Sequence, residues 1–256
     1  MKKIKKGNLT ELWNENRKIY QAEYEPWIAA GKALFNFLND GMMCFAGVDR
    51  AQEKSQALLT AKILNHFLSS NSLLEQGMLL DASLSSRNHL ETVLLALWLL
   101  FEEEEKDCKK WLSGTQFRPV TIRKNLERFG WGLVRGNLVE YSEEDEENRK
   151  VYSFLSAVTH ANVGSALFVE QTRNQQTIEI FVGGSNYSRG LRRHRDIILL
   201  NLEVNTIALH QYAGMVCHIL AQDHTQHRKE DLDEIQRLIN YAGSQQRTNL
   251  WPVIMK

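Results

Sequence analysis

The stretch SSRNHLETVLLALWLL, Ser85–Leu100, predicts one long helix and with it a helical core. Its apolar residues recur at steps of three and four, the spacing that places side chains on one face of an α-helix. Two charges fall within this otherwise apolar stripe, which consists of Leu80, Leu84, Arg87, Glu91, Leu94 and Trp98. Burying Arg87 or Glu91 alone would be costly. We therefore expect the two side chains to be exposed, to pair across one turn, or to contact polar groups of another helix.

Composition favours a mainly α protein with no net charge. The 256 residues hold 31 lysines and arginines against 31 aspartates and glutamates, so binding to nucleic acid or membrane would need a local patch. Three prolines in the whole chain favour helices over a turn-rich all-β texture. Cys44, Cys108 and Cys217 are far apart and odd in number, which argues against a disulfide framework or a thiolate zinc site.

Apolar segments are too short to predict membrane insertion. The longest apolar run, Thr92–Phe101, is about half of a membrane span, and the basic N-terminal segment lacks the apolar core of a signal peptide. We predict a cytoplasmic protein with no membrane partner. Residues 1–20 are expected to form a flexible basic leader, residues 21–245 a single helical-bundle domain, and residues 246–256 a C-terminal tail.

Periodicity and capping signals predict an antiparallel helical bundle of five to seven helices with a small β-hairpin excursion near residues 166–182. Capping-box patterns at Asp49 and Ser72 mark two helix starts, and the acidic run at residues 102–105 is expected to be solvated. The segments ALFVEQ and TIEIFV form the only strand-like text that we identify. The expected helices cover about residues 24–45, 49–69, 73–100, 119–129, 142–160 and 188–220, with a last amphipathic helix ending before Gly243.

A second polar ridge is predicted on the helix that contains YSFLSAVTHAN. Tyr152, Ser156 and His160 follow one another at a spacing of four residues, and Asn162 comes at the helix end. Because polar groups in a bundle interior need polar partners, we expect this ridge to lie against Arg87.

Two interpretations of the combined cluster stay open. In the first, it is a structural polar network in which Arg87 is held between Glu91 and backbone carbonyls and fixes the register of the bundle. In the second, Arg87 supplies a fixed cation for a phosphate or carboxylate, and His160 moves a proton near neutral pH. Glu91 or Ser156 would then orient one of these two groups.

These motifs resemble a known superfamily. An Arg-x-x-x-Glu helix in leucine-rich text, an acidic connector, a Tyr-x-x-x-Ser-x-x-x-His helix, a short extended excursion and a closing helix resemble bacterial helical families of uncharacterised function that are similar to the HEPN superfamily. The resemblance covers roughly residues 72–220. It implies a homodimer. Many HEPN proteins are metal-independent RNA-cleaving toxins or defence effectors that act through an arginine and a histidine, whereas others are non-catalytic modules.

The chain departs from the HEPN nuclease pattern in one respect. These nucleases typically carry Arg and His separated by four to six residues on one helix, and Arg87 and His89 are too close for that. Arg189 and His194 satisfy the spacing, but chance alone supplies such a match in a chain with this many arginines and histidines. The pair is no argument for a nuclease.

Four arginines crowd a predicted helix start, where the helix dipole disfavours cations. A compensating anion is therefore expected, either the backbone of an RNA or the acidic runs at residues 102–105 and 143–147. The four are Arg189, Arg192, Arg193 and Arg195.

No cofactor or metal is predicted. His224 and His227 stand one turn apart near His210, His218 and Asp223, yet histidines near a helix C-terminus also interact favourably with its dipole. For association, the apolar runs MMCFAGV and TVLLALWLL are expected to leave a face for a second copy. The predicted function is a HEPN-like RNA-cleaving toxin or defence effector; the alternative is a helical module that binds a protein, a nucleotide or another small anion.

Overall fold

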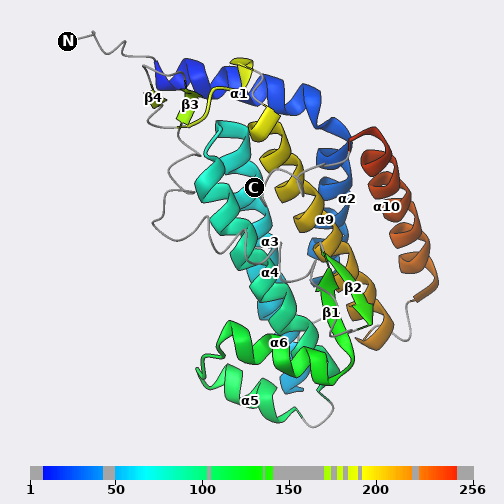
Figure 1. Ribbon diagram of the computed structural model, residues 1–256. Coiled ribbons are helices and arrows are strands. Elements are labelled where there is room, and N and C mark those ends of the chain that lie inside the picture. Colours follow the sequence, from blue (N-terminus) through cyan, green and yellow to red (C-terminus); the bar gives the residue numbers. More distant parts are fainter. Residues whose placement is uncertain are drawn as a thin grey trace.

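The computed structural model describes residues 8–42, 50–102, 105–134, 136–140, 170–173, 178–180, 184–189, 192–220 and 225–246. It is mainly helical, as predicted, and its long helices pack into a bundle (Figure 1). The helices are α1 (Leu9–Glu23), α2 (Glu25–Met42), α3 (Ala51–Gln76), α4 (Leu79–Phe101), α5 (Lys106–Leu112), α6 (Pro119–Arg128), α9 (Arg192–Leu220) and α10 (Thr225–Gln245), with the short 3-10 helix η2 (Tyr187–Arg189) before α9. The described residues thus hold eight α-helices, more than the five to seven predicted.

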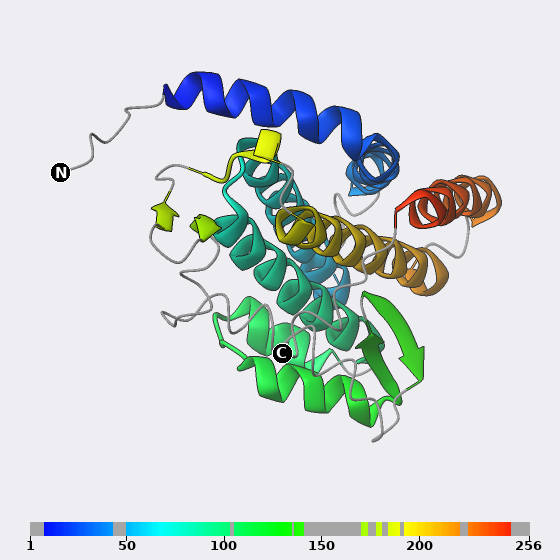
Figure 2. The same cartoon turned by 45° about the horizontal axis from the view of Figure 1, so that its top comes forward.

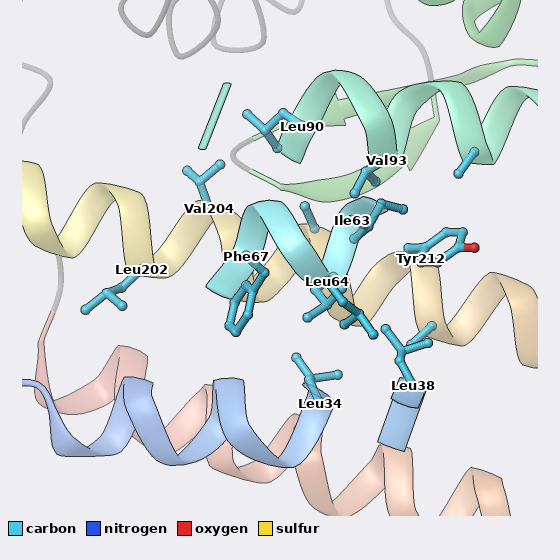
Figure 3. Packing of buried hydrophobic residues seen from close by; sticks show 14 of the residues in the cluster. Leu34, Leu38, Ile63, Leu64, Phe67, Leu90, Val93, Leu202, Val204 and Tyr212 are labelled. Atoms are coloured by element: carbon cyan, nitrogen blue, oxygen red, sulfur yellow. The ribbon is translucent and has the colours of Figure 1, made fainter. Parts of the chain in front are cut away.

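Helix α9 is the central helix of the bundle. It packs against α4, α2, α10 and α3 (Figure 2). From Asp196 to Thr206, Glu203 is the one residue that is not buried, which is the all-round burial of a helix with neighbours on every side. Figure 3 shows the resulting core, in which side chains of α2, α3, α4 and α9 meet.

Helices α3 and α4 form an antiparallel hairpin that turns at Gly77. The predicted break near residue 70 is wrong, because α3 continues through Ser72 to Gln76. Gly77 ends the helix in the left-handed conformation, at φ 82°, which glycine adopts without strain. A Cβ at this position would also collide with Asn16 and Ser185. The capping pattern at Ser72 therefore lies inside a helix. The helix ends five residues later, where Gly77 adopts the left-handed conformation.

Helix α1 packs against α3 and η2, so the structure differs from the expected flexible leader from residue 9 onward. Asn16 is completely buried, and its side chain joins three segments of the chain. Its Nδ2 donates to the carbonyl oxygens of Gln76 (3.0 Å) and Ser185 (2.7 Å), and its Oδ1 accepts from the N–H of Tyr187 (3.0 Å). Helix α1 thereby fastens the α3–α4 turn to the segment that leads into α9.

The acidic run after α4 is partly structural rather than solvated. Both Glu102 carboxylate oxygens accept from the N–H of Asp107, at 2.8 Å, and so cap the first turn of α5. Glu105 accepts from the Arg50 Nε (3.1 Å) and from the Ala51 N–H (3.2 Å), and so caps α3. These two carboxylates tie the end of α4 to two helix starts.

Two antiparallel hairpins complete the described fold. Strands β3 (Glu170–Arg173) and β4 (Ile178–Ile180) pair near residues 166–182, as predicted, with an irregular register between Glu170 and Thr172. Strands β1 (Trp131–Val134) and β2 (Asn137–Glu140) form a second hairpin that the sequence reading missed. Its signal is the pair of short apolar runs on either side of Gly136, which adopts a φ of 88°. Within the described residues, no helix has the length and apolarity that crossing a membrane requires.

Candidate functional site

Arg87 and Glu91 lie one turn apart on α4 and form an ion pair. The Arg87 Nε is 3.0 Å from the Glu91 Oε1, and each side chain is 21% exposed. Pairing across one turn, which is one of the three arrangements expected for these charges, is confirmed. A pair with this exposure is worth up to about 1 kcal/mol, so its main effect is to fix the direction of the guanidinium.

The stripe that contains the pair is the outer face of α4 over its first half and a buried face over its second half. Leu84 is 42% exposed, whereas Leu94 and Trp98 are buried. Helix α6 packs on α4, and the Phe117 ring meets Trp98 edge to face, with centroids 4.7 Å apart. The two charges therefore sit just beyond the point where the described helices cover the stripe.

The face of α4 that meets α3 and α9 carries a buried polar network that the sequence reading missed. Asn205 of α9 donates from Nδ2 to the Ser86 Oγ (2.8 Å) and to the Ser70 Oγ of α3 (3.1 Å), and the two serine hydroxyls are 2.9 Å apart. One turn earlier, Asn201 donates to the Ser83 Oγ at 3.2 Å. All five side chains are buried, so their hydrogen bonds set the register of α4 against its neighbours.

His89 extends this network and joins three helices. Its ring is completely buried, with Nδ1 3.2 Å from the Ile63 carbonyl oxygen on α3 and Nε2 3.2 Å from the Asn205 carbonyl oxygen on α9. Burial lowers the pKa of His89 to about 4, against the smaller opposing effect of the two carbonyls. The ring is therefore neutral at pH 7 and donates to one carbonyl only. It holds α4 in place and does not exchange protons at neutral pH.

A second set of buried polar contacts holds the other end of the hairpin. The side-chain amides of Gln52 and Gln56 donate to the carbonyl oxygens of Leu100 (2.8 Å) and Ala96 (2.9 Å) on α4. The hydroxyl of Tyr212 on α9 donates to the Gln56 Oε1 at 3.0 Å. Because contacts of this kind recur along the whole length of α4, the helix that presents Arg87 has a fixed register.

The sequence carried a signal for this network. Ser83, Ser86 and His89 recur every three residues on α4, and Asn201 and Asn205 stand four apart on α9. Each set is a polar ridge on an apolar helix, the same kind of evidence that singled out Arg87. From the sequence we singled out the charged pair because charges are costlier to bury than uncharged polar groups. The interior of the bundle in fact contains the uncharged polar groups.

The second predicted ridge lies outside the described residues. This applies to Tyr152, Ser156, His160 and Asn162, so their proximity to Arg87 stays a prediction.

The predicted helix start with four arginines, residues 189–195, which we call the basic turn, is described in part, and two of its arginines form ion pairs with carboxylates of the chain. The Arg192 Nε is 3.9 Å from the Asp196 Oδ2, and the Arg195 Nε is 3.6 Å from the Glu23 Oε2 of α1. These partners differ from the acidic runs that we expected. Arg189 lies in η2 and Arg193 in the first turn of α9.

The described histidines do not form a metal site. No group of three His, Cys, Asp or Glu side chains in the described ranges is arranged to hold a metal ion. His210 is engaged with its neighbour, since its Nε2 is 3.4 Å from the Leu232 carbonyl oxygen on α10, and burial lowers its pKa.

The apolar run TVLLALWLL does not offer a face to a second copy. Every residue from Thr92 to Leu100 is buried within the chain itself. Residues 43–48 of the second run, MMCFAGV, lie outside the described residues, so the homodimer stays a prediction that rests on the resemblance.

Comparisons with known proteins identified no relative of this chain. The chain matches no protein-family model, and searches of curated proteins and of solved structures found no match.

Proposed function

We propose that the protein is a HEPN-like, metal-independent RNA-cleaving protein of the cytoplasm with a toxin or defence role. The observation that supports this proposal is the placement of Arg87. Its guanidinium is partly exposed and paired with Glu91, and it lies on a helix that buried hydrogen bonds hold against α3 and α9. A cation that needs no reorganisation is what stabilisation of a phosphorane-like transition state requires.

The chemistry assigns each group a role. The ribose 2′-hydroxyl loses its proton to a base and attacks the adjacent phosphorus, the P–O5′ bond breaks, and the leaving oxygen gains a proton. Arg87 stabilises the charge on the equatorial oxygens, and His160 serves as the base or the acid. Glu91 orients Arg87, while Ser156 orients His160. The neutral, buried His89 takes no part in the proton transfers.

The resemblance carries the remaining parts of the proposal. The active form is a homodimer, and Tyr152, Asn162 and the arginines of the basic turn contact the RNA. Light scattering at micromolar concentration checks the assembly, and a strict monomer contradicts it.

A second candidate function is favoured by the ion pair itself. In this alternative, the chain is a non-catalytic module that anchors a protein, a nucleotide or another small anion on Arg87. The Glu91 carboxylate, 3.0 Å from the Arg87 Nε, occupies a place that a ligand carboxylate or phosphate would take. Binding would then exchange one anionic partner for another, and no acid or base would be needed.

One experiment separates the two candidates. Purified wild type, Arg87→Ala and His160→Ala are incubated with mixed RNA in EDTA, which chelates metal ions and so inactivates contaminating metal-dependent nucleases. The matched control is Arg237→Ala, which also removes a helical arginine from an ion pair, that with Glu234 at 2.7 Å on α10. The ribonuclease proposal requires cleavage by wild type and control, and its loss in both site variants while their circular dichroism spectra stay unchanged.

The opposite results are equally informative. Cleavage that survives in Arg87→Ala contradicts the assigned role of the arginine. If no folded variant cleaves RNA and a small anion binds wild type but not Arg87→Ala, the binding module replaces the ribonuclease.

A further inference from the structure

The helices α5 and α6 and their connection concentrate positive charge. Residues 106–128 hold seven lysines and arginines and two acidic residues, a net charge of +5 in a chain whose total is zero. The two helices lie next to each other at one end of the α3–α4 hairpin (Figures 1 and 2). A local field of this strength attracts anions although the whole chain does not.

The cations of α5 share its outward face. Cys108 faces the core and is completely buried, whereas Lys106, Lys109 and Lys110 are exposed. Lys110 pairs with Asp107 at 2.7 Å. Since positions 106, 109 and 110 are neighbours on a helix surface, the lysines form one cluster.

The cations of α6 also point away from the core. Ile122 and Leu126 are buried against the bundle, and Lys124 and Arg128 lie four residues apart on the other side, both exposed. Arg118, at the N-cap of this helix, is exposed as well. We name the six exposed residues Lys106, Lys109, Lys110, Arg118, Lys124 and Arg128 the α5–α6 basic face.

The neighbouring acidic run at residues 102–105 lowers the net charge of residues 102–128 to +1, since seven cations face six acidic residues there, but two of its carboxylates are directed at helix starts rather than at the exposed cations. Glu102 caps α5 through the N–H groups of Asp107 and Cys108, and Glu105 accepts from Arg50 and from the start of α3. A carboxylate that accepts from backbone N–H groups is directed at those groups rather than at a lysine ammonium.

An aromatic cluster lies directly after the last cation. Phe129 follows Arg128 in the sequence and is 44% exposed. Its ring packs at 6.1 Å from that of Phe101, which stacks on Trp131 at the same centroid distance with an interplanar angle of 6°. The cluster thus holds Phe129 against the protein and leaves part of its ring open to solvent.

We infer that the α5–α6 basic face, with Phe129 at its end, is a binding surface for single-stranded RNA. Lysine and arginine side chains follow a phosphate backbone, and an exposed aromatic ring stacks on an unpaired base, which is the combination that single-strand binding uses. An anionic membrane fits less well. On α6, Ile122 and Leu126 face the core, and the exposed apolar residue Val120 stands alone at 47% exposure, so the helix has no continuous apolar stripe to insert between lipids.

This surface is separate from Arg87 and does not depend on the proposed cleavage. A strand bound along α5 and α6 would be presented to the same α4 that carries Arg87, since α6 packs on that helix. A protein that binds RNA here without cutting it would satisfy the inference and contradict only the ribonuclease proposal.

Fluorescence anisotropy tests the inference with a labelled 20-nucleotide single strand of 2′-O-methyl RNA, which cleavage through the 2′-hydroxyl cannot shorten. The test variant combines Lys109→Glu, Lys124→Glu and Arg128→Glu. The matched control reverses three exposed lysines elsewhere, Lys18 on α1, Lys32 on α2 and Lys229 on α10, and so has the same net charge.

At 50 mM salt we expect the control to bind within about threefold of wild type and the test variant to bind at least about tenfold more weakly. The slope of log K against log salt should fall by about 2 in the test variant, because each single-strand phosphate contact contributes about 0.7. Phe129→Ala should weaken binding by about fivefold or more with an unchanged salt slope. Arg237→Ala, which removes an exposed arginine of α10 outside the α5–α6 basic face, should bind as wild type does.

Three results would overturn the inference. The first is an equal loss in test variant and control, which indicates that only net charge matters. The second is wild type that does not bind the RNA at 50 mM salt. The third is a loss in the test variant on vesicles of phosphatidylserine and phosphatidylcholine without any loss on RNA, which would assign the face to a membrane. A DNA strand of the same sequence bound equally well widens the ligand class to single-stranded nucleic acid.

Discussion

The neutral state of His89 predicts a specific loss of stability in acid. Its ring sits between the Ile63 and Asn205 carbonyl oxygens, and two hydrogen bonds would be complete only with a proton on both nitrogens. Burial nevertheless lowers the pKa to about 4, so the cost of dehydrating a cation outweighs the gain of the second bond. The perturbation is therefore a change of pH from 7.5 to 4.5, compared between wild type and His89→Gln.

The sign follows from linkage. The folded pKa of about 4 lies below the ordinary value of 6.5, so the unfolded chain binds the proton first and the folded state loses stability as pH falls below 6.5. A difference of this size corresponds to about 3.4 kcal/mol once the pH is well below 4, and to about 2.5 kcal/mol at pH 4.5. Above about pH 7.5 the contribution of His89 no longer depends on pH, because neither state then binds the proton.

Urea denaturation at pH 7.5, 6.0, 5.0 and 4.5 measures this contribution. His89→Gln is less stable at pH 7.5 because it alters the packing, yet its free energy of unfolding should fall less steeply in acid, by about 2.5 kcal/mol between pH 7.5 and 4.5. Titration of the imidazole by NMR gives a direct readout, with the His89 signal unmoved down to pH 5.5. Parallel pH profiles of the two proteins, or a His89 signal that titrates near 6.5, would refute the reasoning.

Three further outcomes are expected. Gly77→Ala should destabilise the fold by more than about 2 kcal/mol in thermal melts, whereas Gly114→Ala, with a similar positive φ but open space around it, should cost about 1 kcal/mol; equal losses would contradict the close approach at Gly77. Asn16→Ala should lower the free energy of unfolding in urea by about 3 kcal/mol, because it leaves three backbone groups, two of them in buried hydrogen bonds, without their partner; a loss below about 1 kcal/mol would argue against the junction. A double-mutant cycle of Arg87→Ala and Glu91→Ala should give a coupling energy of about 0.5 kcal/mol that shrinks in 0.5 M salt, since the pair is one-fifth exposed; a coupling above about 2 kcal/mol would indicate a buried structural pair.

Sequence patterns were enough to predict the architecture where local signals and packing agree. The helix at residues 119–129 and the hairpin near residues 166–182 are confirmed, because proline at a first turn and β-branched alternation act locally. The predicted end of α3 was wrong because the capping pattern at Ser72 was preferred to Gly77, which is a local stop signal in the left-handed conformation. The lack of room for a side chain beside Asn16 and Ser185 is a tertiary reason that the sequence does not show.

Of the candidate site, the sequence predicted only the part that lies on α4. Spacing placed Arg87 and Glu91 on one face and allowed their pairing, which the structure shows. The interior role of Ser86 and Asn205 depends on which faces of α4 and α9 meet, and these residues are more than 100 positions apart in the chain. A single sequence does not carry that pairing, since each ridge by itself fits a solvent-exposed face equally well.

The central position of α9 has a consequence for synthesis on the ribosome. Helices α2, α3 and α4 direct apolar residues at a helix that begins only at Arg192, so they leave the ribosome well before the element that completes their core. Two of the three hydrogen bonds of the Asn16 side chain also form late, because their partners lie 169 and 171 residues downstream. Contacts of such separation form late and slowly. The nascent chain therefore exposes apolar surface until most of it has been made. We expect chaperones to protect this intermediate during synthesis.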